Sequence, residues 1–208
     1  MGRIQGRRVE ALFPEEGPIH VLLLGEAPGP LGADQSGIPF WGDRAGQLVY
    51  RALEQAGMAE IPPATWEKWD GGRFATLGLR PSLHGAALGN AFPCCPTDNG
   101  QTFRAPKDRE LRDPANLARL GANLAEAASR CPGLLRVIGL GRRAAWVLDH
   151  VENAPPYELV VLPHPSAQGL LQAAPEKGRG LKLHDLQDKW VEQLKALLRA
   201  KSTVLNKN

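Results

Sequence analysis

Three short segments of the sequence carry side chains able to bind and polarise a flat ring. The first contains Phe40, the second opens with Asn90 and the third opens with His164. An aromatic ring can stack on a planar molecule, and a histidine can donate a hydrogen bond to an oxygen that gains negative charge. An amide offers a donor beside an acceptor, which matches the pairing edge of a pyrimidine, so these residues predict a base-binding pocket. The segments are Gly25–Gly42, Asn90–Pro96 and His164–Leu171.

Carboxylates and main-chain groups of the first segment extend this set. Glu26 and Asp34 could orient a water molecule, and backbone N–H groups of the Gly/Pro turns could hold a phosphate or a carbonyl oxygen. These residues also have ordinary structural explanations. Glu26 could form a salt bridge, Phe40 could belong to the core and Asn90 could cap a turn. The choice depends on where the fold brings the three segments.

The pattern of apolar residues predicts elements that would bring the segments together. Short apolar runs predict strands at Ile19–Leu24, Ala86–Ala91, Leu134–Leu140 and Leu159–Leu162. Apolar stripes predict helices at Arg44–Gln55, Leu111–Ser129, Gly141–Leu148 and Leu183–Ala200, and residues 59–82 predict a short helix and a surface connection. Alternating strands and helices form a doubly wound sheet, whose strands end at one cleft. We expect residues 1–200 to form a single domain and residues 201–208 a flexible tail.

The composition excludes several classes of protein. The chain has 208 residues, of which 43% are hydrophobic, enough to bury the core of one domain. No apolar run reaches the roughly 18–20 residues that cross a bilayer, and the first residues lack the apolar stretch of a signal peptide, so we expect a cytoplasmic protein. The three cysteines are too few for a disulfide framework. The first hundred residues are net acidic and the remainder net basic, which indicates a polyanionic partner.

The same segments resemble the motifs of a known family. The stretch VLLLGEAPGPLGADQSGIPFWGDRAGQLV (residues 21–49) resembles the first motif of the uracil-DNA glycosylase superfamily, and LPHPSAQGLL (162–171) resembles its His-Pro-Ser motif. Asn90 falls where that family places its base-reading Asn, and VIGLGRRAAWVL (137–148) is similar to the family's inner strand and helix. The resemblance implies an α/β fold, a three-layer α/β/α sandwich around a short, mostly parallel central sheet.

Two branches of the superfamily share this resemblance. Parts of the first motif are similar to the iron–sulfur, thermophile-type family, and parts to the single-strand-selective monofunctional type. The cysteines of an iron–sulfur cluster are absent, because none precedes Cys94, and we expect no metal and no other cofactor. Ala27 stands where the best-known members have an Asp and the single-strand-selective type an Asn. The group that positions water there is therefore missing, and Glu26 or Asp34 could substitute.

The resemblance implies a monofunctional DNA repair enzyme that flips uracil out of DNA and hydrolyses its N-glycosidic bond. His164 would hydrogen-bond a carbonyl of the leaving base, and a water held by Glu26 or Asp34 would complete the reaction. The residues expected to bind the base are Ala27, Phe40 and Asn90. Those expected to contact DNA, with Leu170 or Leu171 as a wedge, are Arg142, Arg143, Ser166, Gln168, Leu170, Leu171, Lys177 and Arg179. The partner would be DNA and not a membrane, and the protein a monomer.

Other functions stay open at this point. A member of the same fold could bind DNA and lack the chemistry, which Ala27 favours. A glycosylase could instead remove another deaminated base, such as hypoxanthine or xanthine, because a side-chain amide can flip to suit either edge. A small-molecule α/β hydrolase is disfavoured, since the chain lacks the G-x-S-x-G nucleophile motif.

Overall fold

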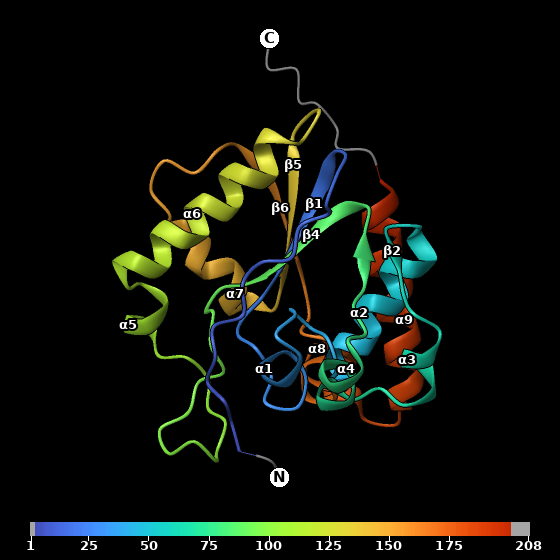
Figure 1. The fold of residues 1–208 in the computed structure, drawn as a ribbon. Helices are drawn as coiled ribbons and strands as arrows, with labels where there is room; N and C mark the ends of the chain where they lie inside the picture. The colour runs from blue at the N-terminus through green and yellow to red at the C-terminus, as the bar shows by residue number, and fades with distance from the viewer. Residues whose placement is uncertain (1–2, 201–208) are drawn as a thin grey trace.

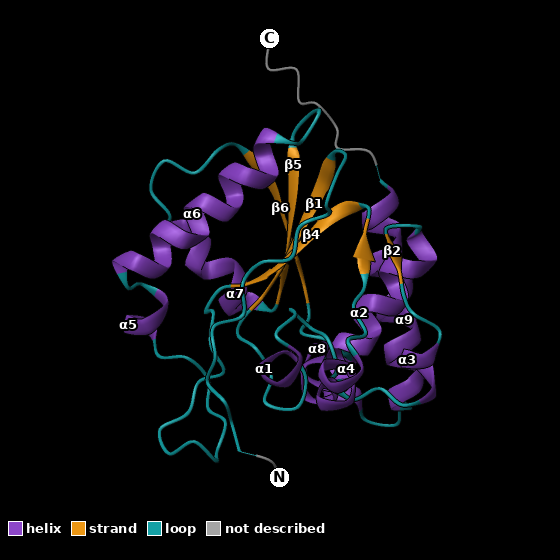
Figure 2. Ribbon diagram, viewed as in Figure 1, coloured by secondary structure: helices purple, strands orange, loops and turns teal. Residues whose placement is uncertain are grey.

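One sheet of parallel strands organises the computed structural model, which describes residues 3–200 (Figures 1 and 2). Its strands are β1 (Ile19–Gly25), β4 (Gly85–Asn90), β5 (Leu135–Leu140) and β6 (Tyr157–Leu162). They lie in the order β4-β1-β5-β6, and each neighbouring pair is parallel. Helices lie on both faces of this sheet, so the prediction of a three-layer α/β/α sandwich is confirmed.

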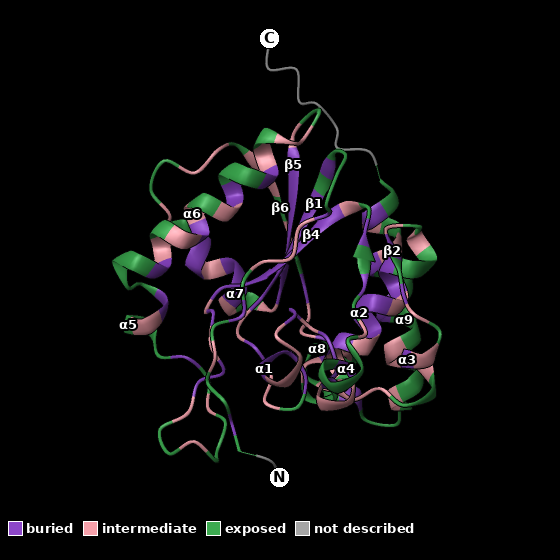
Figure 3. Ribbon diagram, in the orientation of Figure 1, coloured by how far each residue is buried: buried purple, intermediate pink, exposed green. Residues whose placement is uncertain are grey.

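The central strands β1 and β5 are buried along nearly their whole length because both of their faces are covered. Val21 and Leu23 of β1 pack in the core formed with α2 (Arg44–Ala56) and α9 (Leu183–Arg199). Leu22 and Leu24 pack on the other face, in the core formed with α6 (Pro114–Ser129). This alternation follows from the two-residue period of a strand. Figure 3 shows the central strands buried and the helices exposed on their outer sides.

Two helices predicted from the apolar pattern are interrupted in the structure. The helix expected over residues 111–129 is two helices, α5 (Asp108–Leu111) and α6. Asp113 caps α6 through the backbone N–H of Ala115, and Pro114 is the first residue of that helix, a position that needs no N–H. The helix expected over residues 141–148 is α7 (Arg142–Trp146), followed by the 3-10 turn η1 (Val147–His150).

The connection between α2 and β4 contains a ribbon that the sequence did not predict. The strands β2 (Ala59–Glu60) and β3 (Ser82–Leu83) pair antiparallel, and α3 (Ala64–Glu67) and α4 (Gly71–Leu77) lie between them in the chain. An aromatic cluster fixes this region. The centroid of the Trp41 ring lies 4.6 Å from that of Tyr50, 4.9 Å from that of Trp69 and 4.7 Å from that of Phe74. The cluster therefore supports the loop that ends at Trp41.

The N-terminal segment runs along the free edge of β4. Leu12 and Leu88 exchange two backbone hydrogen bonds of 2.8 Å, and the N–H of Val9 donates to the carbonyl of Pro93 at 2.8 Å. A covered edge cannot pair with another chain. The loops after the strands contain short helical turns, which are α1 (Ala33–Ser36), α8 (Ala167–Ala173) and η2 (Pro175–Gly178).

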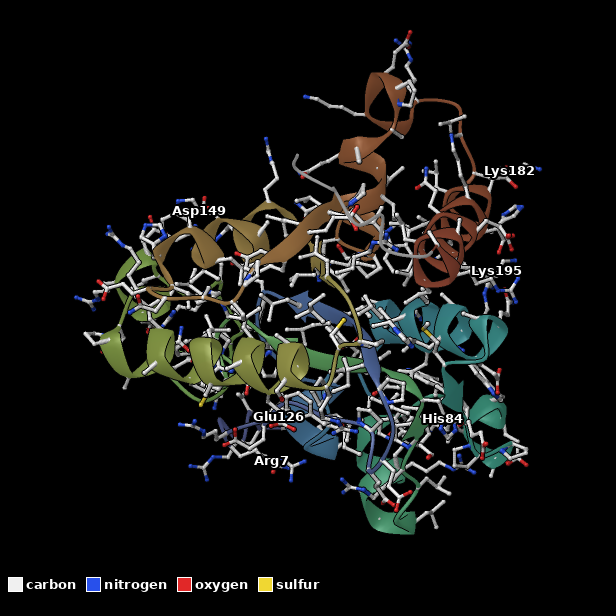
Figure 4. The ribbon with its side chains drawn as sticks, turned by 90° about the horizontal axis from the view of Figure 1, so that it is seen from above. Arg7, His84, Glu126, Asp149, Lys182 and Lys195 are labelled. Carbon is white, nitrogen blue, oxygen red and sulfur yellow. The ribbon has the colours of Figure 1, made fainter. Side chains whose placement is uncertain are left out.

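The outer surface is polar where the helices face away from the sheet. Figure 4, the view from above, places the labelled side chains of Asp149 and Lys182 at the outside of the molecule, and both residues are exposed. No helix within residues 3–200 combines the length and apolar character that crossing a bilayer requires. The tail predicted at residues 201–208 lies outside the described part of the chain.

Candidate active site

A cavity of about 250 Å³ lies where β1 and β4 end, and the loop after β6 completes its wall. The three segments with candidate side chains all reach it. Phe40 comes from the loop after β1, Asn90 is the last residue of β4, and His164 follows β6. The structure thus brings together the ring, the amide and the imidazole. The lining residues are Gly25–Leu31, Phe40, Asp43, Ala45, Asn90, Phe103, His164 and Pro165.

The amide of Asn90 is buried at the base of this cavity with an unused donor. The residue is only 2% exposed, and its Nδ2 has no hydrogen-bond partner among the described residues. A buried N–H without a partner destabilises the fold, and among the described side chains without one Asn90 is the member that lines this cavity. The amide is therefore available to pair with a group that enters the cavity.

Phe40 and Gly25 fit closely against each other and against this amide. A Cβ atom on Gly25 would lie 2.5 Å from the ring of Phe40 and 2.9 Å from Oδ1 of Asn90. Only glycine allows the ring and the amide to approach the end of β1 in this way. The backbone of Phe40 has a φ of 62°, which is strained for a residue with a side chain. The hydroxyl of Tyr50 donates to the carbonyl of Pro39 at 2.8 Å and holds this turn.

Two hydrogen bonds position His164, one to the backbone before it and one to its imidazole. The indole Nε1 of Trp190, on α9, donates to the carbonyl of Pro163 at 2.9 Å. The backbone N–H of Ser166 donates to Nδ1 of His164 at 3.2 Å. An Nδ1 that accepts a hydrogen bond leaves the proton on Nε2, which makes Nε2 the donor of the neutral ring. Burial lowers the pKa of His164 below its ordinary value of 6.5 and favours this neutral form.

Glu26 lies on the cavity wall in an ion pair. Its Oε1 accepts a hydrogen bond from Nε of Arg143 at 2.7 Å. The same guanidinium donates hydrogen bonds to Oδ1 of Asp108 at 2.9 Å and to the carbonyl of Pro106 at 2.7 Å. The salt bridge that the sequence left open for Glu26 is therefore present. It ties the loop after β1 to α5 and α7.

Asp34 does not line the cavity, contrary to its expected catalytic role. It is fully buried in α1, where Oδ2 accepts the backbone N–H of Gln5 at 2.7 Å and Oδ1 that of Gly6 at 2.8 Å. Its carboxylate therefore anchors the N-terminal segment to the loop after β1. Both oxygens are engaged away from the cavity, and this placement favours a structural role.

Asp43 is a cavity residue that the sequence analysis missed. Its Oδ1 accepts the backbone N–H of Gly46 at 2.7 Å and caps α2, and burial raises the pKa of the carboxyl. Its Oδ2 would lie 2.7 Å from a Cβ on either Gly29 or Gly32, so the loop after β1 closes tightly over it. The signal was present in the sequence, because Asp43 follows Phe40 by one short turn. Ala27 lines the same cavity and adds no polar side-chain atom.

A second cavity of about 590 Å³ lies beside the first, and Glu26 and His164 border both. Arg142 and Arg143, two of the predicted DNA contacts, line this second cavity. Its wall also includes Gln172, from α8. The imidazole and the carboxylate therefore stand between a smaller cavity, lined mostly by apolar groups, and a larger one lined by two arginines.

The predicted DNA contacts after His164 are only partly available. Ser166 caps α8, because its hydroxyl oxygen accepts the N–H of Gly169 at 3.1 Å, and Gln168 is exposed. Leu170 is 5% exposed and belongs to the main core, so its expected role as a wedge is wrong. The helical turn of α8 points it at α9 instead of outward. Leu171 is half-buried beside Gly178.

The turn that follows α8 is basic and exposed. Lys177 and Arg179, two of the predicted DNA contacts, are both exposed. Lys177 has a φ of 55° and its neighbour Glu176 a φ of 49°, so two successive side chains adopt the left-handed conformation. Leu181 is 47% exposed and is the prominent apolar side chain of this turn.

The cysteines do not form the donor set of a metal cluster. Cys94 and Cys95 are neighbours near the N-terminal segment, and burial raises the pKa of the Cys95 thiol to about 12. A thiol binds metal as the thiolate, which such burial disfavours. Among the described residues, no group of three or more His, Cys, Asp or Glu side chains is placed to hold a metal ion.

Together the fold and the cavity define a class: an α/β protein whose parallel strands end at a cavity lined by an aromatic ring, an amide and an imidazole. Residues 14–195 match the family model described as the uracil DNA glycosylase superfamily, and the chain belongs to that superfamily.

Relatives with curated names match shorter stretches. A protein of Thermus thermophilus named Type-5 uracil-DNA glycosylase is 37% identical over 128 residues, which is 62% of this chain and 48% of the relative. A protein of the same name from Mycobacterium tuberculosis is 35% identical over 71 residues, or 34% of this chain and 26% of the relative. The chain therefore spans about half the length, or less, of these relatives.

A solved structure supports the fold. The crystal structure of wild-type SMUG2 from Pedobacter heparinus superposes with a TM-score of 0.51. The superposition covers 88% of this chain and 77% of the other, at 15% sequence identity. At this identity the similarity concerns the arrangement of strands and helices.

Proposed function

We propose that the protein is a DNA glycosylase that removes uracil from DNA by hydrolysing its N-glycosidic bond. One observation carries the proposal: the buried Nδ2 of Asn90 has no partner among the described residues and lies beside Phe40 at the base of the cavity. An amide with a free donor and an aromatic ring would read the pairing edge of a flipped pyrimidine while stacking on its face. The names of the relatives support this substrate.

His164 would act on the leaving base. As the bond between the sugar and the base breaks, its electron pair stays on the base, which leaves as an anion. The Nε2–H of His164 would donate to a carbonyl oxygen of the base where this charge develops. Removing one such donor typically lowers a rate by about 10²–10³. The contact between Ser166 N–H and Nδ1 supports this role, because it holds the required tautomer.

Water would then attack the positively charged sugar. Two carboxylates line the cavity, Glu26 and Asp43. Glu26 is neutralised in part by Arg143, and Asp43 uses one oxygen to cap α2. We propose that the second oxygen of Asp43 holds the water, in the place of the polar group that Ala27 lacks. As the water oxygen bonds to the sugar, its proton would pass to the carboxylate of Asp43.

DNA would bind across the ends of the parallel strands. Arg142 and Arg143 beside the larger cavity, and Lys177 and Arg179 on the turn after α8, would contact phosphates, together with Ser166 and Gln168. We propose that residues 3–200 act as one unit and as a monomer. DNA as the substrate, and three free thiols among the described residues, support a place in the cytoplasm.

Base release from defined oligonucleotides tests the proposal. Labelled DNA with one uracil, single-stranded or opposite G or A, is incubated with the protein and then treated with alkali to cut abasic sites. We expect cleavage that His164→Ala and Asn90→Ala depress strongly. His184→Ala, at an exposed histidine on α9, is the matched control and should be unaffected.

The alanine at position 27 favours a second candidate function, which the same assay tests. Without a polar side chain at that position, the protein could bind damaged DNA without releasing a base. Intact uracil, hypoxanthine and xanthine in every oligonucleotide, together with tight binding to an abasic site, would replace the proposed function with this one. Release of hypoxanthine or xanthine alone would keep the chemistry and change the substrate.

A further inference from the structure

Two large apolar side chains lie exposed at the rim of the smaller cavity. Phe103 is 44% exposed and Leu31 is 54% exposed, and both line that cavity. They come from different loops, one after β4 and one after β1. A single exposed apolar side chain needs no explanation, but two at the mouth of a cavity that also presents Asn90 and His164 are a candidate surface for another molecule to cover.

The loop that carries Phe103 is firmly held, so its exposure is a property of the fold. Oδ1 of Asn99 accepts the backbone N–H groups of Gln101 and Thr102 at 2.9 and 2.8 Å. The next residue, Arg104, binds both carboxylate oxygens of Glu110, at 2.7 and 2.6 Å. These contacts fix the chain on both sides of Phe103 and leave its ring at the rim.

The loop that carries Leu31 is equally constrained. A Cβ on Gly71, the first residue of α4, would lie 2.7 Å from the carbonyl oxygen of Leu31 and 2.6 Å from that of Gly32. The backbone of Leu31 therefore rests directly on α4. Its side chain points away from the core even though the backbone beneath it is closely packed.

We propose that Phe103, together with Leu31, forms an apolar clamp that contacts the DNA base next to the flipped nucleotide. The clamp rests on the proposed function. A flipped nucleotide stays covalently bonded to its neighbours, so a neighbouring nucleotide must lie at the rim of the cavity that holds it. An aromatic ring stacks on any base, and this contact is tolerant of sequence. Phe103 is thus a positioning residue for the substrate strand.

Binding of DNA with a fluorescent neighbour base tests the clamp. The probe is a single-stranded oligonucleotide that contains a tetrahydrofuran abasic analogue flanked by 2-aminopurine, whose fluorescence falls when it stacks. We expect quenching with the wild-type protein. Phe103→Ala should leave the probe bright and weaken its binding about tenfold, and Phe103→Trp should restore both. Leu77→Ala, at another exposed leucine, should change binding by no more than about twofold.

The same variants separate the clamp from the chemistry. If the wild-type protein releases uracil and Phe103→Ala binds and quenches the probe as the wild type does, the clamp is wrong and the proposed function stands. If the wild-type protein releases no base but Phe103→Ala still loses quenching and affinity, the clamp stands and the proposed function fails. Equal losses of affinity for the probe and for free uracil would also overturn the clamp, because Phe103 would then belong to the base pocket itself.

Discussion

Nε of Arg143 lies 2.7 Å from Oε1 of Glu26, and Glu26 borders both cavities together with His164. The negative charge of Glu26 raises the pKa of His164, against the larger effect of burial, which lowers it. Arg143 offsets part of that charge. The ion pair therefore favours the charged imidazole less than an unpaired Glu26 would, and burial keeps the pKa of His164 below its ordinary value.

Substitution of Arg143 should move the acidic limit of activity. In Arg143→Gln, Glu26 keeps its full charge, so the protonated form of His164 is favoured and its pKa rises. The rate of base release at saturating DNA should then begin to fall at a higher pH than in the wild type. Rates measured across the acidic range check this. In the double variant that also carries Glu26→Gln, the acidic limit should move back to lower pH. An acidic limit in Arg143→Gln equal to that of the wild type would contradict the coupling between the ion pair and His164.

Loss of the imidazole should affect the chemical step and leave DNA binding intact. His164→Ala removes the donor to the leaving base, and the single-turnover rate of base release should fall about 10²–10³-fold. Affinity for an abasic analogue should stay within about twofold of the wild type, because the contacts to phosphate remain. A variant that loses affinity and rate to the same extent would assign His164 to binding instead.

A single methyl group at Gly25 should disrupt the cavity without unfolding the sheet. The Cβ of Gly25→Ala would meet the ring of Phe40 at 2.5 Å and Oδ1 of Asn90 at 2.9 Å, so both must move. A misplacement of about 1 Å can lower a rate by about 10². The variant should therefore be folded by circular dichroism and strongly impaired in base release. Gly133→Ala, where a Cβ meets nothing within 4 Å, is the control.

Because Leu170 is buried, replacing it with alanine should lower the stability of the protein. If Leu170 were a wedge in DNA, the same change would lower activity instead. Leu170→Ala removes a side chain from the main core, and it should lower the free energy of unfolding by about 2–5 kcal/mol. Leu181→Ala, at an exposed leucine of the next turn, should change that free energy by about 0.5 kcal/mol or less. Urea unfolding of both variants measures the difference. Equal stability of the two would contradict the packing of α8.

The loop that carries Phe103 should depend on acid pH through Glu110. Hydrogen bonds from Arg104 lower the pKa of Glu110 from its ordinary 4.5 to about 2. Because the folded pKa is below the unfolded one, the stabilisation is complete above about pH 4.5 and is lost as the pH falls toward 2. Glu110→Gln should therefore lower the Tm near neutral pH and make little difference near pH 2. A difference in Tm that is the same at both pH values would show that the ion pair contributes nothing.

The sequence predicted the strands well because both faces of the sheet are covered. Residues 21–24 form a continuous apolar run, and residues 135–140 are apolar except for Arg136, which is itself buried. The ribbon of β2 and β3 escaped prediction because each strand has two residues, too few for any alternation. The break between α5 and α6 was missed because apolar spacing continues across Pro114, and only the cap at Asp113 marks the new start.

Site residues that directly follow a strand could be predicted from the sequence. Residues whose role depends on which way a side chain turns could not. Asn90 and His164 follow strands directly, so the topology alone brings them together. Asp43 was missed because an Asp before a helix is explained by capping, and only the folded chain places this residue on the cavity wall. The sequence could not tell whether Leu170 or Leu171 would be the exposed leucine, because this depends on how α8 is rotated about its axis. In the structure Leu170 lies in the core.

The hydrogen bond from Trp190 to the carbonyl of Pro163 has a consequence for the order of events during synthesis. The strands of the sheet all precede α9 in the chain, so they can emerge from the ribosome and pair before Trp190 exists. At that stage the turn that carries His164 lacks its support from α9. Because α9 also completes the core around Val21 and Leu23, a chain that stops before α9 would have that core exposed and the turn of His164 unsupported.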